Sequence, residues 1–431
     1  MIKNFTVTNF RNVTADHLPL GRINVFIGPN NSGKSNFIKA MTFFSDMLRH
    51  KYNGTQKSAF LNALSRYGWE RVKNKCLSKS VADYSTIDLS WVFELDEQEL
   101  EYQFSFAVGR DIKDNHIVRE RLSKTTPQPG YDQPYNYFFC HEKIGEGVVS
   151  TAIKKSNKNK RRRFALSPQE TFLGQFKDIL LSRKEIYTTD FVRVDIAELL
   201  GKIETYFEDV CVYESSGFDI KRMRQRVQNK ENGSYLYQDG SNYVKALSTA
   251  FDAEPVRRGQ LICKLKEALP DLLDVVPAWT EDGQGKCNFV FQKGEQPVSF
   301  DMSDLSVGTL KMLIWWYLFQ VREAHPTSLL AIDEPENNLH VAWQKLLCEW
   351  MQQSRAYQQC LISTHSPDFL DGFTEGFKRG LVSVFVFGRD GVVRPLSYDG
   401  LDSNIRQDIE DGWELGDLYR GGDAYLGGWP W

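Results

Sequence analysis

No stretch of this sequence stays apolar over the eighteen or so residues that a membrane-spanning helix needs. The N-terminal segment 1–8 also lacks the basic start and the apolar segment of a secretion signal. Hydrophobic residues make up 41% of the chain and charged residues 25%, which is typical of a soluble globular protein. The sequence therefore predicts a protein of the cytoplasm that does not enter a membrane.

Paired cysteines, heptad repeats and a strong net charge are missing as well. The seven cysteines are scattered, without the C-x-x-C spacing of zinc sites and without the pattern of a disulfide framework, so a reducing compartment is indicated. Residues 167–273 contain no sustained heptads, which excludes a long coiled coil. A net charge of −3 argues against a protein that coats nucleic acid, although a local basic surface could still bind it.

What the sequence does contain is a glycine-rich loop in a defined context. Residues 28–35 read Gly-Pro-Asn-Asn-Ser-Gly-Lys-Ser and match G-x-x-x-x-G-K-[ST]. The apolar run 23–27 before them predicts a buried strand, and the helical spacing over 36–44 predicts a helix. The backbone N–H groups of such a loop and the positive end of the helix bind phosphate. This context favours a nucleotide site over a glycine-rich turn without a ligand.

The polar residues of this loop have expected roles. Lys34 is expected to contact the β- and γ-phosphates, and the Ser35 hydroxyl to hold a magnesium ion. Arg11 lies in a predicted turn just ahead of the loop and either folds back over the nucleotide or is a surface arginine. The loop residues expected to contact the nucleotide are Gly28, Asn30, Asn31, Ser32, Gly33, Lys34, Ser35 and Asn36.

Strand patterns follow the loop. Residues 88–95 and 101–108 alternate at period two around an acidic turn and predict a hairpin, and 117–122 predicts its next strand. An antiparallel sheet is therefore expected beside the nucleotide fold.

The middle of the chain carries less specific signals. Residues 125–163 predict a loop that ends in the basic run 154–163. This run either neutralises phosphates of nucleic acid or is a solvated loop. Residues 167–273 predict a polar helical insertion, whose sequence does not indicate what it binds.

Acidic residues end the next strong strand pattern. The apolar run 329–332 leads into Asp333 and Glu334. Asp333 is placed to hold magnesium through water, and Glu334 to orient and deprotonate an attacking water. In the alternative, the two carboxylates only cap a helix. Upstream, a small polar turn with Ser306 and Gly308 precedes an apolar helix, and by itself it would be an ordinary helix N-cap.

A histidine ends the following strand pattern, over residues 359–365. A lone histidine is usually structural. This strand, however, is expected beside the Asp333 strand, and ligands gather at the carboxyl edge of parallel sheets. His365 is therefore expected to reach the γ-phosphate or its attacking water.

Taken in order, these motifs resemble a known family. The phosphate loop, the Ser-x-Gly-Thr turn, Ile-Asp-Glu-Pro-Glu and Ser-Thr-His-Ser-Pro are similar to those of the ABC-type ATPases of the RecF, SMC and OLD groups. They most resemble the compact bacterial AAA-family ATPases that are like the ATPase half of OLD nucleases. The resemblance covers roughly residues 1–125 and 290–420.

The resemblance implies specific partners and roles. ATP and Mg²⁺ are the implied cofactors, with Lys34, Glu334 and His365 as catalytic residues and Ser35 and Asp333 as metal ligands. Ser306 and Gly308 form the implied signature turn, which in such families contacts the γ-phosphate bound to the opposite subunit. A homodimer that sandwiches two nucleotides is thus implied. Its subunit-crossing loop contains Asn337 and Asn338.

Departures from the family pattern narrow the prediction. Val307 stands in the signature turn where a small or acidic residue is more usual. The coiled coil of SMC proteins is missing, and the 66 residues after His365 are expected to be too few for the nuclease half of OLD proteins. The glycine-rich segment 421–431, with Trp429 and Trp431, is either a frayed tail or a docking peptide. ATP is favoured over GTP because no Asn-Lys-x-Asp motif occurs.

The predicted fold is α/β, an ABC-type P-loop NTPase head with a flanking antiparallel β-sheet and a helical insertion. Residues 1–125 are expected to form the N-terminal part of the ATPase lobe, 126–285 the basic loop and helical insertion, and 286–431 the C-terminal part of the lobe with a tail.

Three functions compete. The first is the ATPase subunit of a bacterial anti-phage defence complex, of the abortive-infection type, which senses a trigger and controls a separately encoded effector such as a TOPRIM-like nuclease. The second is a RecF/SMC-like DNA-repair ATPase that acts directly on DNA. The third, a scaffold that binds ATP only to dimerise, is disfavoured because a complete set of Asp333, Glu334 and His365 has no purpose without hydrolysis. The slightly acidic charge and the helical insertion favour the first, which needs a protein partner.

Overall fold

The protein divides into two compact units. Unit 1 contains residues 1–21, 29–210 and 385–395, and unit 2 contains residues 22–28, 211–384 and 396–431. The structure, a computed structural model, describes residues 1–49, 58–74, 86–127, 129–151, 160–182, 192–225, 227–228, 235–324, 326–388, 392–422 and 426. Residues 154–159 of the basic run and the two terminal tryptophans lie outside the described residues.

Unit 1 is built on an eight-stranded antiparallel sheet with the order β2-β1-β4-β5-β6-β7-β8-β9. Its strands are β1 (Ile2–Phe10), β2 (Val13–Pro19), β4 (Thr86–Leu95), β5 (Gln98–Ala107), β6 (His116–Pro127), β7 (Pro134–Cys140), β8 (Glu146–Thr151) and β9 (Lys160–Ala165). The period-two alternation of the sequence gives this sheet one buried face, since Ile87, Leu89 and Trp91 of β4 are all buried. The predicted hairpin is confirmed as β4 and β5, with β6 as its next strand.

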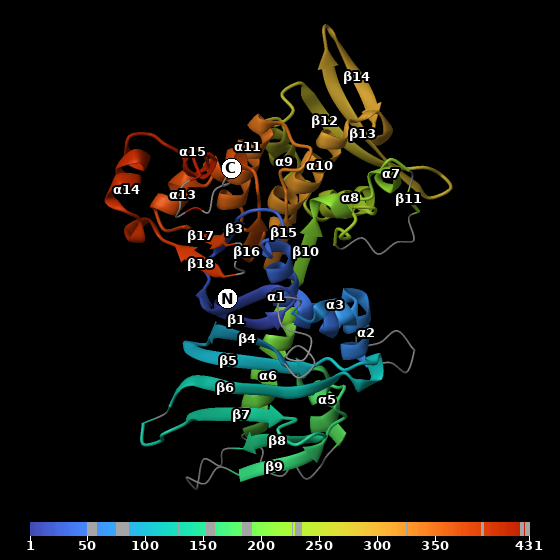
Figure 1. Cartoon of the computed structure of the whole chain (residues 1–431). Helices are drawn as coiled ribbons and strands as arrows, with labels where there is room; N and C mark the ends of the chain where they lie inside the picture. Colours follow the sequence, from blue (N-terminus) through green and yellow to red (C-terminus); the bar gives the residue numbers. More distant parts are fainter. Residues whose placement is uncertain are drawn as a thin grey trace. The chain divides into compact units, whose positions relative to one another are not determined.

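Helices cover the buried face of this sheet. Phe44 of α1 and Phe207 of α6 lie 4.9 Å apart between ring centroids, and both rings contact Trp91 of β4. Figure 1 shows α5 and α6 on one face of the sheet, crossing its strands. The helices of unit 1 are α1 (Lys34–Arg49), α2 (Ala59–Tyr67), α3 (Trp69–Val72), α5 (Phe172–Ser182) and α6 (Val192–Glu208), with the short 3₁₀ turn η1 (Ile112–Asp114).

One prediction for unit 1 is wrong. Residues 125–163 were expected to form a loop, but β7, β8 and β9 lie there, and the last four residues of the basic run belong to β9. Strand β9 pairs with β8 along its whole length, with Arg163 opposite Val148. An arginine can occupy a strand because its aliphatic stem packs while its head stays in water. Pairing with a neighbouring strand therefore overrode the loop-like composition.

A buried glutamate joins the sheet to α5. Glu120 of β6 is fully buried and accepts hydrogen bonds from the Tyr102 hydroxyl at 2.6 Å and from the N–H groups of Phe172 and Leu173 at 2.6 and 2.9 Å. Burial raises the pKa of this carboxyl from 4.5 to about 7, against the effect of these donors.

Because of this shift, Glu120 should make the stability of the protein depend on pH. Between pH 4.5 and about pH 7 the folded state holds a proton that the unfolded state has lost, so the free energy of unfolding falls as pH rises through this window. The contribution is on the order of 3 kcal/mol. Thermal melts at about pH 5 and about pH 8 should show a smaller loss of Tm for Glu120→Gln than for the wild type. Glu142→Gln, an exposed control, should keep the wild-type difference. An equal loss of Tm between the two pH values in all three proteins would contradict the assignment of this pH dependence to Glu120.

Unit 2 contains a sheet in which the strands β10 (Val210–Glu214), β15 (Thr327–Asp333), β16 (Tyr357–Ser363) and β3 (Ile23–Ile27) lie in this order. Of these, β15, β16 and β3, which follow from continuous apolar runs, are parallel. Nearly every residue of β15, β16 and β3 is buried, as expected for strands covered on both faces. The prediction that the Asp333 strand and the His365 strand are neighbours is confirmed by the parallel pairing of β15 with β16.

A second, smaller sheet and the remaining helices complete unit 2. The small sheet consists of β11 (Val227–Gln228), β12 (Leu272–Trp279), β13 (Gln284–Lys293) and β14 (Gln296–Asp301), with β13 pairing to the other three. The helices are α7 (Ile220–Met223), α8 (Tyr243–Ala253), α9 (Arg258–Leu265), α10 (Val307–Trp316), α11 (Val341–Gln353), α12 (Pro367–Asp371), α13 (Thr374–Lys378), α14 (Ser403–Glu410) and α15 (Leu415–Arg420). The short turns are η3 (Ser215–Gly217), η4 (Met302–Asp304), the π-helix η5 (Tyr317–Val321), η6 (Arg322–Ala324) and η7 (Tyr398–Gly400).

Strands β17 (Val382–Phe387) and β18 (Val393–Leu396) follow β3 in the strand order. The boundary between the units passes through β17. Among the helices of the described ranges, none combines the length and apolar character needed to cross a bilayer.

Candidate functional site

The glycine-rich loop leaves β3 at Gly28 and enters α1 at Lys34, as the sequence predicts. Gly33 has a φ of +109°, and a Cβ there would lie 2.9 Å from Val13 Cγ2, so both backbone and space require glycine. Phe37 N–H donates to Gly33 O at 2.8 Å and closes the first turn of α1. A helix that begins directly after a tight loop turns the N–H groups of its first residues toward that loop.

Two side chains of the loop are buried and polar. Lys34 is 6% exposed, and its Nζ donates to Pro29 O at 3.0 Å. Ser32 is 5% exposed, and its hydroxyl has no hydrogen-bond partner within the described part of the chain. A buried hydroxyl without a partner is costly unless a ligand satisfies it. The loop thus has the character of a cradle for a hydrogen-bonding ligand.

A chain of polar side chains supports the loop from the β1–β2 turn. Arg11 Nη1 donates to Asn36 Oδ1 at 2.8 Å, and Asn36 Nδ2 donates to Asn12 Oδ1 at 2.7 Å. Asn12 Nδ2 in turn donates to Asn31 O at 3.1 Å. Arg11 also donates to Tyr67 O, so it links the turn to α1 and α2. Asn12 was not predicted, because a turn asparagine carries no sign of the loop it will contact.

In unit 2, parallel pairing brings the predicted strand-end residues to one edge. Asp333 of β15 lies opposite Ser363 of β16, and Ser363 lies opposite Phe26 of β3, two residues before Gly28. The Ser363 hydroxyl donates to Asp333 Oδ1. Ser363 was also missed by sequence reasoning, although its position before Thr364 and His365 could have suggested it.

Glu334 sits in a sharp turn just after β15. Its φ is +51°, a left-handed conformation that is uncommon for residues other than glycine, and its N–H donates to Ser363 O at 3.0 Å. Glu334 Oε2 accepts a hydrogen bond from Asn337 Nδ2 at 2.8 Å, and Oε1 lies 3.3 Å from His365 Nδ1. The side chains of Glu334 and His365 are 35% and 42% exposed, so both can reach a ligand from solvent.

A second glutamate lies behind this pair. Glu336 is 5% exposed, and its Oε1 accepts hydrogen bonds from Thr364 Oγ1 at 2.6 Å and from His365 N at 3.3 Å. The same oxygen lies 3.7 Å from His365 Nδ1. Burial raises the pKa of Glu336, and the hydrogen bond from Thr364 opposes that shift. Two carboxylates therefore flank one imidazole. Glu336 was not predicted, because an Asp-Glu-Pro-Glu sequence does not reveal which carboxylate is buried.

The predicted signature turn meets the loop after Glu334. Ser306 Oγ accepts a hydrogen bond from Thr309 N at 3.1 Å and caps α10, so the simple N-cap role is present. Beyond that role, a Cβ at Gly308 would lie 2.7 Å from Asn338 O, which shows how closely α10 approaches this loop. Ser306 and Val307 remain exposed at the start of the helix.

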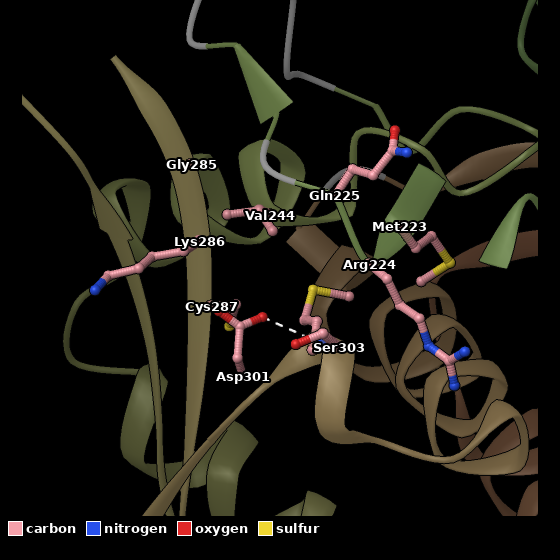
Figure 2. Close-up of a pocket in the computed structure, with 10 residues that line it drawn as sticks. Met223, Arg224, Gln225, Val244, Gly285, Lys286, Cys287, Asp301 and Ser303 are labelled. Carbon is pink, nitrogen blue, oxygen red and sulfur yellow. Dashed lines mark hydrogen bonds between the residues drawn. The ribbon is translucent and has the colours of Figure 1, made fainter. Parts of the chain in front are cut away.

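A pocket of about 210 Å³ lies beside the chain segment that leads to Ser306. Figure 2 shows Asp301 and Ser303 on one side of it, joined by the hydrogen bond from Ser303 N to Asp301 Oδ1, and Val244 and Lys286 on others. Arg224 turns away from the pocket, and its Nη2 donates to Leu305 O at 2.7 Å. Within the described residues, no cluster of histidine, cysteine and carboxylate side chains could by itself hold a metal.

Comparisons with known proteins agree with the motifs. A family model described as "AAA ATPase domain" matches residues 1–256, and one described as "AAA domain, putative AbiEii toxin, Type IV TA system" matches residues 184–371. The chain is 24% identical over 375 residues to "Endonuclease GajA" of Bacillus cereus (strain VD045), which covers 85% of this chain and 56% of that protein. The chain thus spans little more than half the length of this relative.

The fold also has a counterpart among solved structures. A crystal structure of an "SmcHead bound to the C-winged helix domain of ScpA" has a TM-score of 0.50 at 12% identity, with 94% of this chain and 99% of that chain covered. At this identity the likeness shows the fold alone, and it confirms the predicted α/β head with antiparallel strands.

Proposed function

Since this chain belongs to the AAA ATPase domain family and is an ATPase of the ABC type, we propose that it is the ATP-hydrolysing subunit of a bacterial anti-phage defence complex. It senses a trigger and controls an effector carried by another chain. The observation that carries this proposal is the similarity to Endonuclease GajA over 85% of the chain. The name of that relative suggests a nuclease as the effector.

The proposal assigns chemistry to the residues at the strand ends. Glu334 accepts the proton of the attacking water, since its carboxylate is partly exposed and is held by Asn337 and His365. His365 contacts the γ-phosphate or that water. Lys34 and the N–H groups of the loop bind the phosphates. Arg11 either folds back over the nucleotide or is a surface arginine of the turn.

Magnesium fits the oxygen groups of these motifs. The proposed ligands are the Ser35 hydroxyl and, through water, the Asp333 carboxylate, and Mg²⁺ prefers such oxygen ligands. The Ser32 hydroxyl, which has no hydrogen-bond partner among the described residues, fits a phosphate-bearing ligand as well. When bound, magnesium neutralises charge on the β- and γ-phosphates.

Ser306 and Gly308 are proposed to act across a dimer. The start of α10 is exposed at Ser306 and Val307, so a phosphate on a second copy can approach the N-terminus of this helix. Two nucleotides would then be sandwiched between the subunits, with the loop of Asn337 and Asn338 at the interface.

Gly308→Ala should lower the ATP hydrolysis rate by about tenfold or more, because the new Cβ would displace either α10 or the loop at Asn338 O. Gly259→Ala is the matched control, since Gly259 also lies in a helix but a Cβ there meets nothing within 4 Å. Phosphate release at saturating ATP measures the effect. A Gly308→Ala protein as active as the Gly259→Ala protein would show that this close approach does not matter for turnover.

The proposal is tested by isolating the complex. The tagged protein is expressed with its native neighbouring genes and purified in magnesium and a non-hydrolysable ATP analogue, and the mass and components of the product are determined. A stoichiometric protein partner with nuclease-type carboxylates is the expected result. A dimer that retains DNA and no protein would overturn the defence assignment.

The alternative is a RecF/SMC-like ATPase that acts directly on DNA. The observation that favours it is the basic run, whose last residue Arg163 is exposed on β9. In that case DNA itself should stimulate hydrolysis without a protein partner, and the stimulation should weaken steeply with salt.

A further inference from the structure

Lys311 is a buried cation one turn into α10. It is 4% exposed, and its Nζ donates to Ser215 Oγ at 3.0 Å, to Asn337 O at 3.2 Å and to Asn338 Oδ1 at 2.9 Å. All three acceptors are neutral, and within the described ranges Lys311 forms no ion pair with a carboxylate. Burial accordingly lowers the pKa of Lys311.

A charged lysine in this environment contributes little to the stability of the folded protein. A buried charge loses its hydration, and neutral hydrogen-bond partners replace that loss incompletely. An apolar side chain of similar length would be expected to stabilise the same position at least as well. The position of Lys311 therefore points to a role in holding its partners in place.

Two of those partners belong to the loop that carries Asn337. The Asn337 amide donates to Glu334 Oε2 at 2.8 Å, and Asn338 has a φ of +68°, a left-handed conformation in which asparagine is enriched. Lys311 holds this loop at one carbonyl and one side-chain oxygen. A continuous set of hydrogen bonds thus runs from Lys311 through this loop to Glu334.

The third partner, Ser215, comes from a different part of the chain. It is 1% exposed in η3, directly after β10, in the insertion between the two halves of the ATPase motifs. The insertion contacts the start of α10 a second time, through Arg224 Nη2 and Leu305 O at 2.7 Å. The segment 215–224 therefore touches both the residue before the signature turn and the lysine after it.

We infer that Lys311 is a positioning residue that sets the orientation of Glu334 through Asn337 and makes it depend on the segment 215–224. This inference rests on the proposed role of Glu334. A partner that shifts this segment would release Ser215 and Arg224, and would thereby change the rate of hydrolysis without touching the nucleotide.

Lys311→Met tests the inference because it keeps the length and removes the three donors. The hydrolysis rate at saturating ATP should fall by about tenfold, while the affinity for a fluorescent ATP analogue stays within about twofold and Tm is unchanged or raised. Lys345→Met, an exposed lysine of α11 paired with Glu414, should behave as wild type. A purely structural lysine would instead lower Tm and leave the rate of the folded protein unchanged.

A double-mutant cycle shows whether Lys311 acts through Asn337. Asn337→Ala removes the amide that holds Glu334, so adding Lys311→Met should lower the rate little further. If the losses in rate of the two single variants instead multiplied in the double variant, to about a hundredfold, the route through Asn337 would be overturned. Ser215→Ala, a mild change, should lower the rate by a few fold. If Lys311→Met does not fold, Ser215→Ala and Asn337→Ala test the inference in its place.

The failure of this inference can be told apart from failure of the proposed function. Wild-type turnover in Lys311→Met, with none in Glu334→Gln, would overturn the inference alone. Wild-type turnover in Glu334→Gln would overturn the assignment of Glu334 itself.

Discussion

Glu334→Gln is expected to bind ATP like the wild type and to lose hydrolysis by at least about a hundredfold, because removal of a general base costs on the order of 10²–10⁴ in rate. The amide is nearly isosteric with the carboxylate and can still accept the hydrogen bond from Asn337, so the turn after β15 should be preserved. The substitution removes the base that takes a proton from water, together with the negative charge beside His365.

Single-turnover and steady-state phosphate release measure this loss, and a fluorescent ATP analogue measures binding. Glu349→Gln on α11 is the control, since it changes an exposed glutamate of the same unit. Because ATP persists in the variant, the molecular mass of the variant protein in magnesium and ATP should be that of a dimer. The variant should also retain a partner protein more strongly than the wild type does. A variant that turns over at the rate of the Glu349→Gln protein would exclude Glu334 as the base.

Lys34→Ala should fail at the earlier step, with ATP affinity lowered by about a hundredfold or more. The lysine is buried in the loop, and the substitution removes a cation that is expected on the phosphates. A charge-assisted contact of this kind contributes about 1.5–3 kcal/mol, and the loss of the charge in a buried site adds to it.

A thermal shift measures this effect directly. ATP with magnesium should raise the Tm of the wild type, since a ligand that binds only the folded state stabilises it, and should leave the Tm of Lys34→Ala unchanged. Lys39→Ala lies on the same helix α1 and should keep the wild-type shift. If ATP stabilises Lys34→Ala and wild type equally, the loop is not the nucleotide site.

The two variants separate binding from hydrolysis. Lys34→Ala should give a protein that neither binds ATP nor dimerises with it, whereas Glu334→Gln should give an ATP-bound state that cannot reset. Comparing partner retention in the two would show which nucleotide state holds the effector. Slow turnover of the wild type is expected in either case, because hydrolysis waits for closure of the dimer.

Much of the fold could be predicted because its signals are local. The alternation in β4 and β5 and the apolar runs of β15 and β16 reflect how each strand is buried, and burial leaves a direct trace in residue order. The strand β9 was missed because basic composition resembles that of a loop, while the pairing with β8 that makes it a strand joins residues that are not adjacent in the chain.

The same division holds at the candidate site. The sequence by itself determined the loop from Gly28 to Ser35 and the strand-end residues Asp333, Glu334 and His365, since motif spacing and strand periodicity are local properties. Only the tertiary structure decided that Asn12 supports the loop, that Glu336 is buried behind His365, and that Lys311 joins Ser215 to the loop of Asn337. These contacts depend on which side chains are buried and on where they point between elements that lie far apart in the chain. The residue pattern of a single element predicts neither property.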